Sequence, residues 1–138
     1  MLGRSSYTRE ELNSARTSID RQLAAYRALA ATLDDTALAA FEPLFFNNMT
    51  LVLDRLFVHR VRNVSGKDGN PLNEVELITE SLMSNDGVFR GNNVIKYVPE
   101  KAVVGLAAGD RIRLTAEQFD GLHRAYFDEV ERRFVKEG

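Results

Sequence analysis

The chain has 138 residues, of which 44% are hydrophobic, and this length and composition are typical of one domain that folds around its own core. Lys and Arg total 18 while Asp and Glu total 20, so the net charge is −2, which argues against an extended nucleic-acid surface. The chain has no cysteine, which excludes disulfides, thiolate metal ligands, cysteine nucleophiles and iron–sulfur clusters.

The first predicted helix begins after Thr8, because Thr8 and Glu11 have the spacing of a capping box. Apolar residues then recur at intervals of three and four and predict a seam that faces another helix: Ile19, Leu23, Tyr26, Ala30 and Leu33. The acidic pair at 34–35 interrupts this pattern. Residues 36–41 are therefore predicted to form only a short helical connector.

The second predicted helix runs from Pro43, which fits a first helical turn, to about Val61. It is apolar over most of its circumference, so we expect it to be the central helix, with a core face made of Phe45, Met49, Val52, Leu53, Leu56 and Phe57. The most apolar stretch, 43–53, is too short to span a membrane. The N-terminus also lacks the apolar region of a secretory signal, so we expect a cytoplasmic protein without a membrane contact.

The rest of the chain predicts two more helices separated by a small β region. Turn-forming residues at 63–70 lead to a third helix from Pro71 to about Ser84, which Asn70 can cap. Segments 88–89, 94–98 and 111–114 have strand character. A last helix runs from a second capping box, at 115–118, to about Val135.

The predicted fold is therefore mainly α: a four-helix, bundle-like single domain of residues 1–138. A small β-hairpin or minisheet is inserted between the third and fourth helices. A resemblance to other proteins is carried by five segments of the chain: 46–49, 53–60, 66–75, 99–101 and 109–115. This set of segments resembles a family of small bacterial proteins for which no activity is known. The resemblance implies one domain over roughly 44–135 and no particular reaction.

One cluster of residues near the end of the second predicted helix could bind an anion. It contains five side chains with basic nitrogen atoms: Arg55, His59, Arg60, Arg62 and Lys67. A guanidinium group matches the oxygens of a carboxylate or phosphate in two-point geometry. The alternative is that most of this cluster is the solvated face of the helix, near the negative end of its dipole. Arg60 points toward the apolar side and would then need an acidic partner such as Asp54 or Glu74.

Other motifs do not support a specific chemistry. Segment 66–70 has glycines at both sides of Lys67 and Asp68 but lacks the spacing of a phosphate-binding or calcium-binding loop. Asp120 and His123 share a helix face, yet with only 2 histidines in the chain we predict no metal site and no cofactor. The third helix carries acids at 74, 76 and 80, so it does not suit DNA reading.

Two functional hypotheses remain. The first is a non-enzymatic domain that forms a homodimer or binds a protein partner, because the regular seam of the first helix could pair with its own copy. The second is a module, or a small enzyme, that captures a small anionic ligand with the cluster at 55–67. The sequence offers no nucleophile motif that would favour an enzyme.

Overall fold

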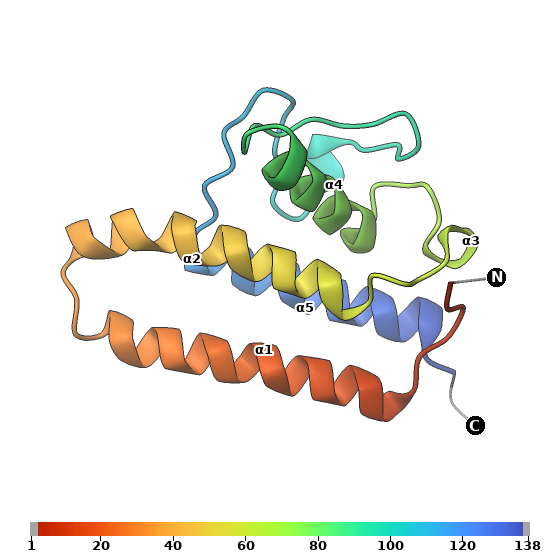
Figure 1. Cartoon of the computed structure of the whole chain (residues 1–138), viewed down its shortest axis with the longest axis horizontal. Coiled ribbons are helices and arrows are strands. Elements are labelled where there is room, and N and C mark those ends of the chain that lie inside the picture. Colours follow the sequence, from red (N-terminus) through yellow and green to blue (C-terminus); the bar gives the residue numbers. More distant parts are fainter. Residues whose placement is uncertain (1–2, 137–138) are drawn as a thin grey trace.

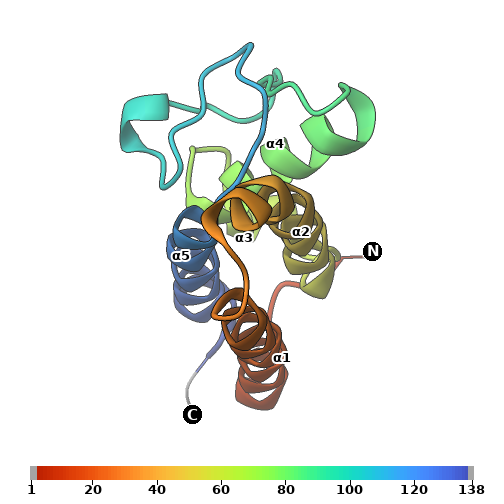
Figure 2. The ribbon, with the colours of Figure 1, turned by 90° about the vertical axis from the view of Figure 1, so that its left-hand side faces the viewer.

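The computed structural model describes residues 3–136 and shows a mainly helical chain (Figure 1). Its elements are α1 (Arg9–Ala30), α2 (Asp35–Leu56), α3 (Arg62–Ser65), α4 (Pro71–Ser84), the 3-10 helix η1 (Pro99–Lys101) and α5 (Ala116–Phe134). Helices α2 and α5 lie side by side, with α1 on one side of them and α4 on the other (Figure 2). A long loop connects α4 to α5 and covers the far side of α4. The core lies between these helices, and α1, α2, α4 and α5 all contribute buried side chains to it.

The capping signals of the sequence are confirmed. The Thr8 hydroxyl accepts a hydrogen bond from the Glu11 amide at 3.0 Å, and the Glu11 carboxylate accepts one from the Thr8 amide at 2.9 Å. The same reciprocal box opens α5, and the Asn70 side chain caps α4. The seam of α1 is buried as far as Tyr26, but α1 ends at Ala30. Leu33 therefore lies outside the helix and is 38% exposed.

The prediction of a connector followed by a separate second helix was wrong. A single helix, α2, begins after Asp34, whose carboxylate accepts a hydrogen bond from the Ala37 amide at 2.8 Å. Pro43 thus lies inside the helix and not in its first turn. The acidic pair starts a helix because a carboxylate satisfies free amides at a helix N-terminus. The helix also ends before Val61, since Phe57 leaves the helical conformation with φ −130° and ψ 39°.

The two sides of α2 differ in burial. Phe46, Met49 and Leu53 are buried in the core, as is Thr50, whose hydroxyl bonds to the Phe46 carbonyl. Val52 was predicted in the core but is 41% exposed, because it lies on the opposite side of the helix. By length and composition alone α2 could cross a membrane, and 22% of its most apolar window is buried within the molecule. This helix therefore combines a core face with an apolar outer face.

The predicted β minisheet was wrong. The described part of the chain contains only isolated bridges between single residues, among them Val88 with Arg111 and Asp68 with Lys96. The two halves of the expected hairpin bond to different partners: the Phe89 amide to the Asp110 carbonyl, and the Lys96 amide to the Lys67 carbonyl. Alternation in the sequence here reflects side chains that anchor a loop, because Phe89, Ile95, Ile112 and Leu114 are buried without forming a ladder.

Helical side chains hold this loop by its backbone. The buried Glu74 carboxylate on α4 accepts hydrogen bonds from the amides of Val103 and Val104, each at 2.8 Å. The Asn47 amide group on α2 donates to the Ile112 carbonyl at 2.9 Å, and its oxygen accepts from the Leu114 amide at 3.1 Å. These bonds pair backbone groups that would otherwise be buried unsatisfied. They replace the sheet ladder that the sequence suggested.

Candidate functional site

Arg60 is the most buried member of the predicted anion-binding cluster. It lies in the turn after α2, and its side chain is only 5% exposed. One guanidinium nitrogen, Nη1, donates to the Phe57 carbonyl at 2.9 Å and to the Tyr126 hydroxyl at 3.2 Å. The other, Nη2, donates to the Asp54 carboxylate at 3.1 Å and to the Leu72 carbonyl at 3.2 Å. Arg60 therefore ties the end of α2 to both α4 and α5.

Arg62 lies next to this group and bonds to α4. Its Nη2 is 2.6 Å from the Glu76 carboxylate, and its Nη1 donates to the Asn73 side chain at 2.7 Å. Glu76 also lies 3.7 Å from Nη2 of Arg60. Two guanidinium groups thus face two carboxylates around a cavity of about 290 Å³. The cluster is electrically balanced, and both arginines already bond to their own chain.

Burial shapes the ionisation of these groups. It raises the pKa of Asp54 above its usual value, although the adjacent Arg60 guanidinium opposes this change. Burial alone would lower the pKa of Arg60, but the negative charges of Asp54 and Glu76 and the hydrogen bond to Asp54 oppose it, and the pKa is raised. Burial also raises the pKa of Tyr126, so its hydroxyl stays neutral and accepts from Arg60. The Arg60 guanidinium is therefore a permanent buried charge that depends on Asp54 and Glu76.

The structure brings together only part of the predicted anion site. Arg60 and Arg62 share the cavity, whereas the side chains of Arg55, His59 and Lys67 are exposed and do not line it. A helix that continued to Val61, as predicted, would have placed Arg55, His59 and Arg62 on one face. Because α2 ends at Leu56, helical spacing does not apply to residues 59 and 62. For Arg60, the sequence analysis named Asp54 correctly as an acidic partner, but it named Glu74 where the structure has Glu76. Asn73 and Glu76 lie three residues apart on one helix and therefore share a face. This spacing is the sequence signal that could have identified them as the partners of Arg62.

His123 forms a second buried polar group, between α5 and α1. Its Nε2 is 3.1 Å from the Asp120 carboxylate, and the ring stacks on Phe119 with centroids 5.5 Å apart. In the neutral tautomer that donates to Asp120, Nδ1 is an acceptor, and it is buried without a partner among the described residues. Within 3–136 no group of three potential metal ligands occurs. The pair is therefore a buried imidazole held by one carboxylate.

Acidification is expected to destabilise the protein through His123. Burial lowers the pKa of His123 below 6.5, against the opposing effects of Asp120 and Asp20. Well above pH 6.5 the imidazole is neutral in both states and contributes no pH dependence. As the pH falls below 6.5, the unfolded chain binds a proton before the folded chain does, so the free energy of unfolding decreases until the lowered pKa is reached. Urea unfolding between pH 7.5 and 5 measures this loss.

His123→Phe is expected to flatten that pH dependence, since a phenyl ring fits among the aromatic neighbours and binds no proton. The matched control is His59→Gln, which removes the other histidine but leaves His123 and its buried surroundings in place, so the slope contributed by His123 should remain. An equal slope in the wild type and His123→Phe would contradict the assignment.

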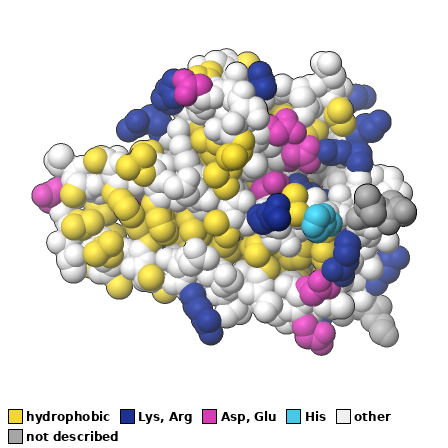
Figure 3. All heavy atoms as spheres, in the orientation of Figure 1, with side chains coloured by type: hydrophobic (Ala, Val, Ile, Leu, Met, Phe, Trp, Pro, Cys, Tyr) yellow, Lys and Arg dark blue, Asp and Glu magenta, His cyan; other side chains and the backbone are white. Residues whose placement is uncertain are grey.

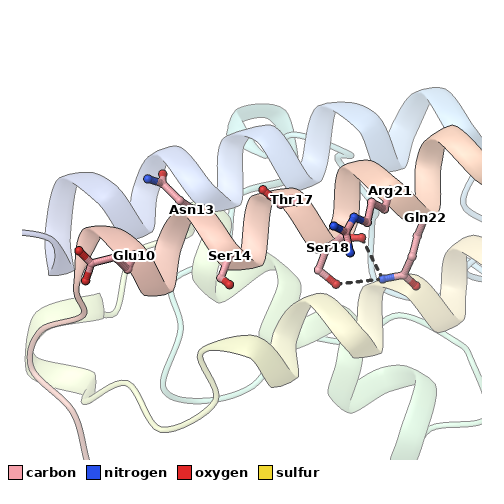
Figure 4. A pocket seen from close by; sticks show the side chains of 7 residues that line it. All are labelled: Glu10, Asn13, Ser14, Thr17, Ser18, Arg21 and Gln22. Atoms are coloured by element: carbon pink, nitrogen blue, oxygen red, sulfur yellow. Dashed lines mark hydrogen bonds between the residues drawn. The ribbon is translucent and has the colours of Figure 1, made fainter.

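The polar face of α1 carries a shallow depression that is lined by side chains from this helix alone (Figure 4). Small hydroxyl side chains such as Ser14 and Thr17 alternate there with longer ones such as Arg21. The Gln22 amide donates to the Ser18 carbonyl at 3.3 Å, so even the longest neutral side chain bonds back to its own helix. A single helix provides no second wall, and the depression does not enclose a ligand.

The outer face of α2 carries an exposed strip that we call the α2 stripe. Its residues follow one another at helical spacing and are all exposed: Ala40, Leu44, Asn48, Val52 and Arg55. Leu44 is 69% exposed and Val52 is 41% exposed, with the half-buried Phe41 alongside. Figure 3 shows hydrophobic side chains gathered over the end of the molecule where α1 meets α2 and continuing along the helices. These exposed apolar side chains therefore lie next to one another and are not scattered singly over the surface.

The α2 stripe is free of charge until Arg55. The two acids of α2 between residues 36 and 54 point elsewhere: Glu42 accepts hydrogen bonds from the Tyr26 hydroxyl and the Ala116 amide, and Asp54 pairs with Arg60. Asp34 and Asp35 lie at the N-terminal end of the helix. The stripe is therefore uncharged up to Arg55, its basic end, and the acidic N-terminal end of α2 lies beyond its other end.

Comparison of the chain with protein-family models, with curated proteins and with solved structures found no match. The family resemblance of segments 46–75 and 99–115 stays a prediction. Two features of the structure bear on function: the buried Arg60 cluster and the exposed α2 stripe.

Proposed function

We propose that this protein is a non-enzymatic, cytoplasmic helical domain that self-associates through the α2 stripe. The seam of α1, the first candidate for pairing, is buried within the molecule through Leu12, Ile19 and Leu23. Within residues 3–136, α2 instead carries an exposed apolar surface that packs against no other element. Water contact with side chains such as Leu44 and Val52 costs about 25 cal/mol per Å² of apolar surface, so covering this strip is favourable. The exposure of Leu44 is the observation that supports the proposal.

A second copy of the chain suits this surface better than a lipid bilayer does. Helices that lie at a membrane surface use Lys and Arg to contact anionic lipids. No Lys or Arg occurs between Arg27 and Arg55, while Asp34, Asp35 and Glu42 fall in that interval. Helix α2, with an acidic N-terminal end and Arg55 near its other end, is instead complementary to itself, because a two-fold axis can place unlike ends together.

Sedimentation velocity over the micromolar range tests this proposal. The wild-type chain is expected to form a dimer at high micromolar concentration, and Val52→Arg is expected to remain monomeric because it places a charge in the covered strip. Val94→Arg is the matched control, since Val94 is 47% exposed but lies in the loop. A wild-type protein that stays monomeric throughout would overturn the proposal, as would equal dissociation of both variants.

The cavity between Arg60 and Arg62 favours an alternative, in which the protein is a small anion-binding module. Nε of Arg60 is buried there without a hydrogen-bond acceptor among the described residues. An anion would have to displace Glu76 from Arg62, because that carboxylate already neutralises it. Thermal unfolding with phosphate, nucleotides and dicarboxylates tests this: a ligand at 100 times its Kd adds about 2.7 kcal/mol. A shift that persists in Arg62→Ala, or no shift with any anion, contradicts the site.

A further inference from the structure

We infer that two copies of this chain pair α2 against α2 in antiparallel orientation, with the two-fold axis at Asn48. This inference rests on the proposed self-association and adds its geometry. Isologous pairing of one helix with its copy must be either parallel or antiparallel, and the sequence of the α2 stripe distinguishes the two.

The spacing of the apolar residues sets the register. Leu44 and Val52 are each four residues from Asn48, on opposite sides of it along the helix. In an antiparallel pair centred on Asn48, Leu44 therefore faces Val52 of the second copy, and this contact occurs twice. Moving the axis by one turn toward the N-terminus would bring Leu44 against Leu44 and leave Val52 without an apolar partner. Moving it by one turn toward the C-terminus would bring Val52 against Val52 and leave Leu44 without one.

Charge favours the same orientation. In a parallel pair, Arg55 would lie against Arg55 of the second copy, and like charges directly opposed are unfavourable. In the antiparallel pair, Arg55 faces Phe41 of the second copy, and a guanidinium group is attracted to an aromatic ring. It also comes about 10 Å, two helical turns, from the acidic N-terminal end of that copy's α2. This distance exceeds the screening length of about 8 Å in physiological salt, so the attraction is weak there and grows at low salt.

Asn48 suits a position on the axis. Its side-chain amide carries both donors and an acceptor, so two copies related by a two-fold axis can bond to each other. It is exposed, and between residues 3 and 136 no hydrogen bond from its side chain is made, unlike that of its neighbour Asn47. A polar residue within an otherwise apolar helix contact fixes register, because any shift leaves the amide covered and unpaired.

Single cysteines test the arrangement cleanly, since the chain contains none. Asn48→Cys is expected to form an intermolecular disulfide rapidly under mild oxidation. Leu44→Cys alone is expected to form it several-fold more slowly, because its two sulfurs start about 12 Å apart along the axis, beyond the reach of a disulfide. A mixture of Leu44→Cys and Val52→Cys should give the mixed disulfide in preference to either homodimer.

The outcomes separate the orientation from the self-association itself. Rapid homodimer disulfides from Leu44→Cys and from Val52→Cys would show parallel pairing and overturn the inference. A dimer in sedimentation whose three variants all fail to crosslink would show that another surface of the chain pairs, which also overturns it while self-association stands. A monomer in sedimentation would instead remove the proposed function on which the inference rests. Val94→Cys, in the loop, gives the rate of random collision.

Discussion

Replacing Arg60 with Ala is expected to lower the free energy of unfolding by about 3–5 kcal/mol. Asp54 is 14% exposed at its side chain and has its main partner in Arg60, so the substitution leaves a buried carboxylate without a counter-charge. The Tyr126 hydroxyl and the carbonyls of Phe57 and Leu72 lose a donor in the same step. Chemical denaturation at neutral pH measures the effect.

The free energy of unfolding lost in Arg60→Ala should depend on whether Asp54 is ionised. Burial already raises the pKa of this carboxyl, and removal of Arg60 takes away the group that opposes the rise. The unfolded carboxyl titrates near 3.8, so protons bind the folded variant first and stability is regained as the pH falls from 7 toward that value. Asp54→Asn combined with Arg60→Met is expected to recover most of the loss at neutral pH for the same reason.

Arg55→Ala provides the matched control, because Arg55 lies on the same helix end but is exposed. Its effect on stability is expected to stay within about 0.5 kcal/mol. If Arg60→Ala also stayed within that range, the ion pairs around Arg60 would not be holding the end of α2, and an open, ligand-binding role for this arginine would gain support.

Local signals in the sequence were sufficient to predict the starts of α1, α4 and α5. Thr8 with Glu11, and Asn70 with Pro71, place a capping group and its partner within four residues, so no distant contact is needed to recognise them. The start of α2 was harder to predict, because an acidic pair can either interrupt a helix or cap the next one. Pro43 then supports the wrong choice, since a proline is common in a first turn and costly inside a helix.

The loop and the ion-pair cluster depend on distant contacts. Residues 94–98 alternate like a strand, but whether they pair depends on what lies beside them, and here the Lys96 amide finds the Lys67 carbonyl instead. Arg60 needed an acid, and the sequence identified Asp54 correctly. The choice between Glu74 and Glu76 depended on which face of α4 meets α2, and Glu74 instead holds the amides of Val103 and Val104.

Phe46→Ala is expected to cost about 3–5 kcal/mol of unfolding free energy, the usual range for deleting a fully buried aromatic ring. Phe46 is 0% exposed. The centroid of its ring lies 4.8 Å from the ring centroid of Tyr26 on α1 and 5.4 Å from that of Phe119 on α5. It therefore joins three helices at once, and the cavity left behind cannot close without moving one of them. Denaturant unfolding at low protein concentration, where self-association does not contribute, measures the loss.

Leu44→Ala is the paired measurement, two residues away on the outer face of α2, where Leu44 is 69% exposed. It removes a smaller apolar group, and it should leave the stability of the monomer within about 0.5 kcal/mol, because little of its surface is buried by folding. Its effect belongs to dimerisation, which should weaken. Leu44→Ala would then weaken dimerisation without unfolding the monomer, whereas Phe46→Ala would destabilise the monomer. This difference would separate the two faces of α2 experimentally. If Leu44→Ala destabilised the monomer as strongly as Phe46→Ala, the stripe would be part of the core and unavailable to a second copy.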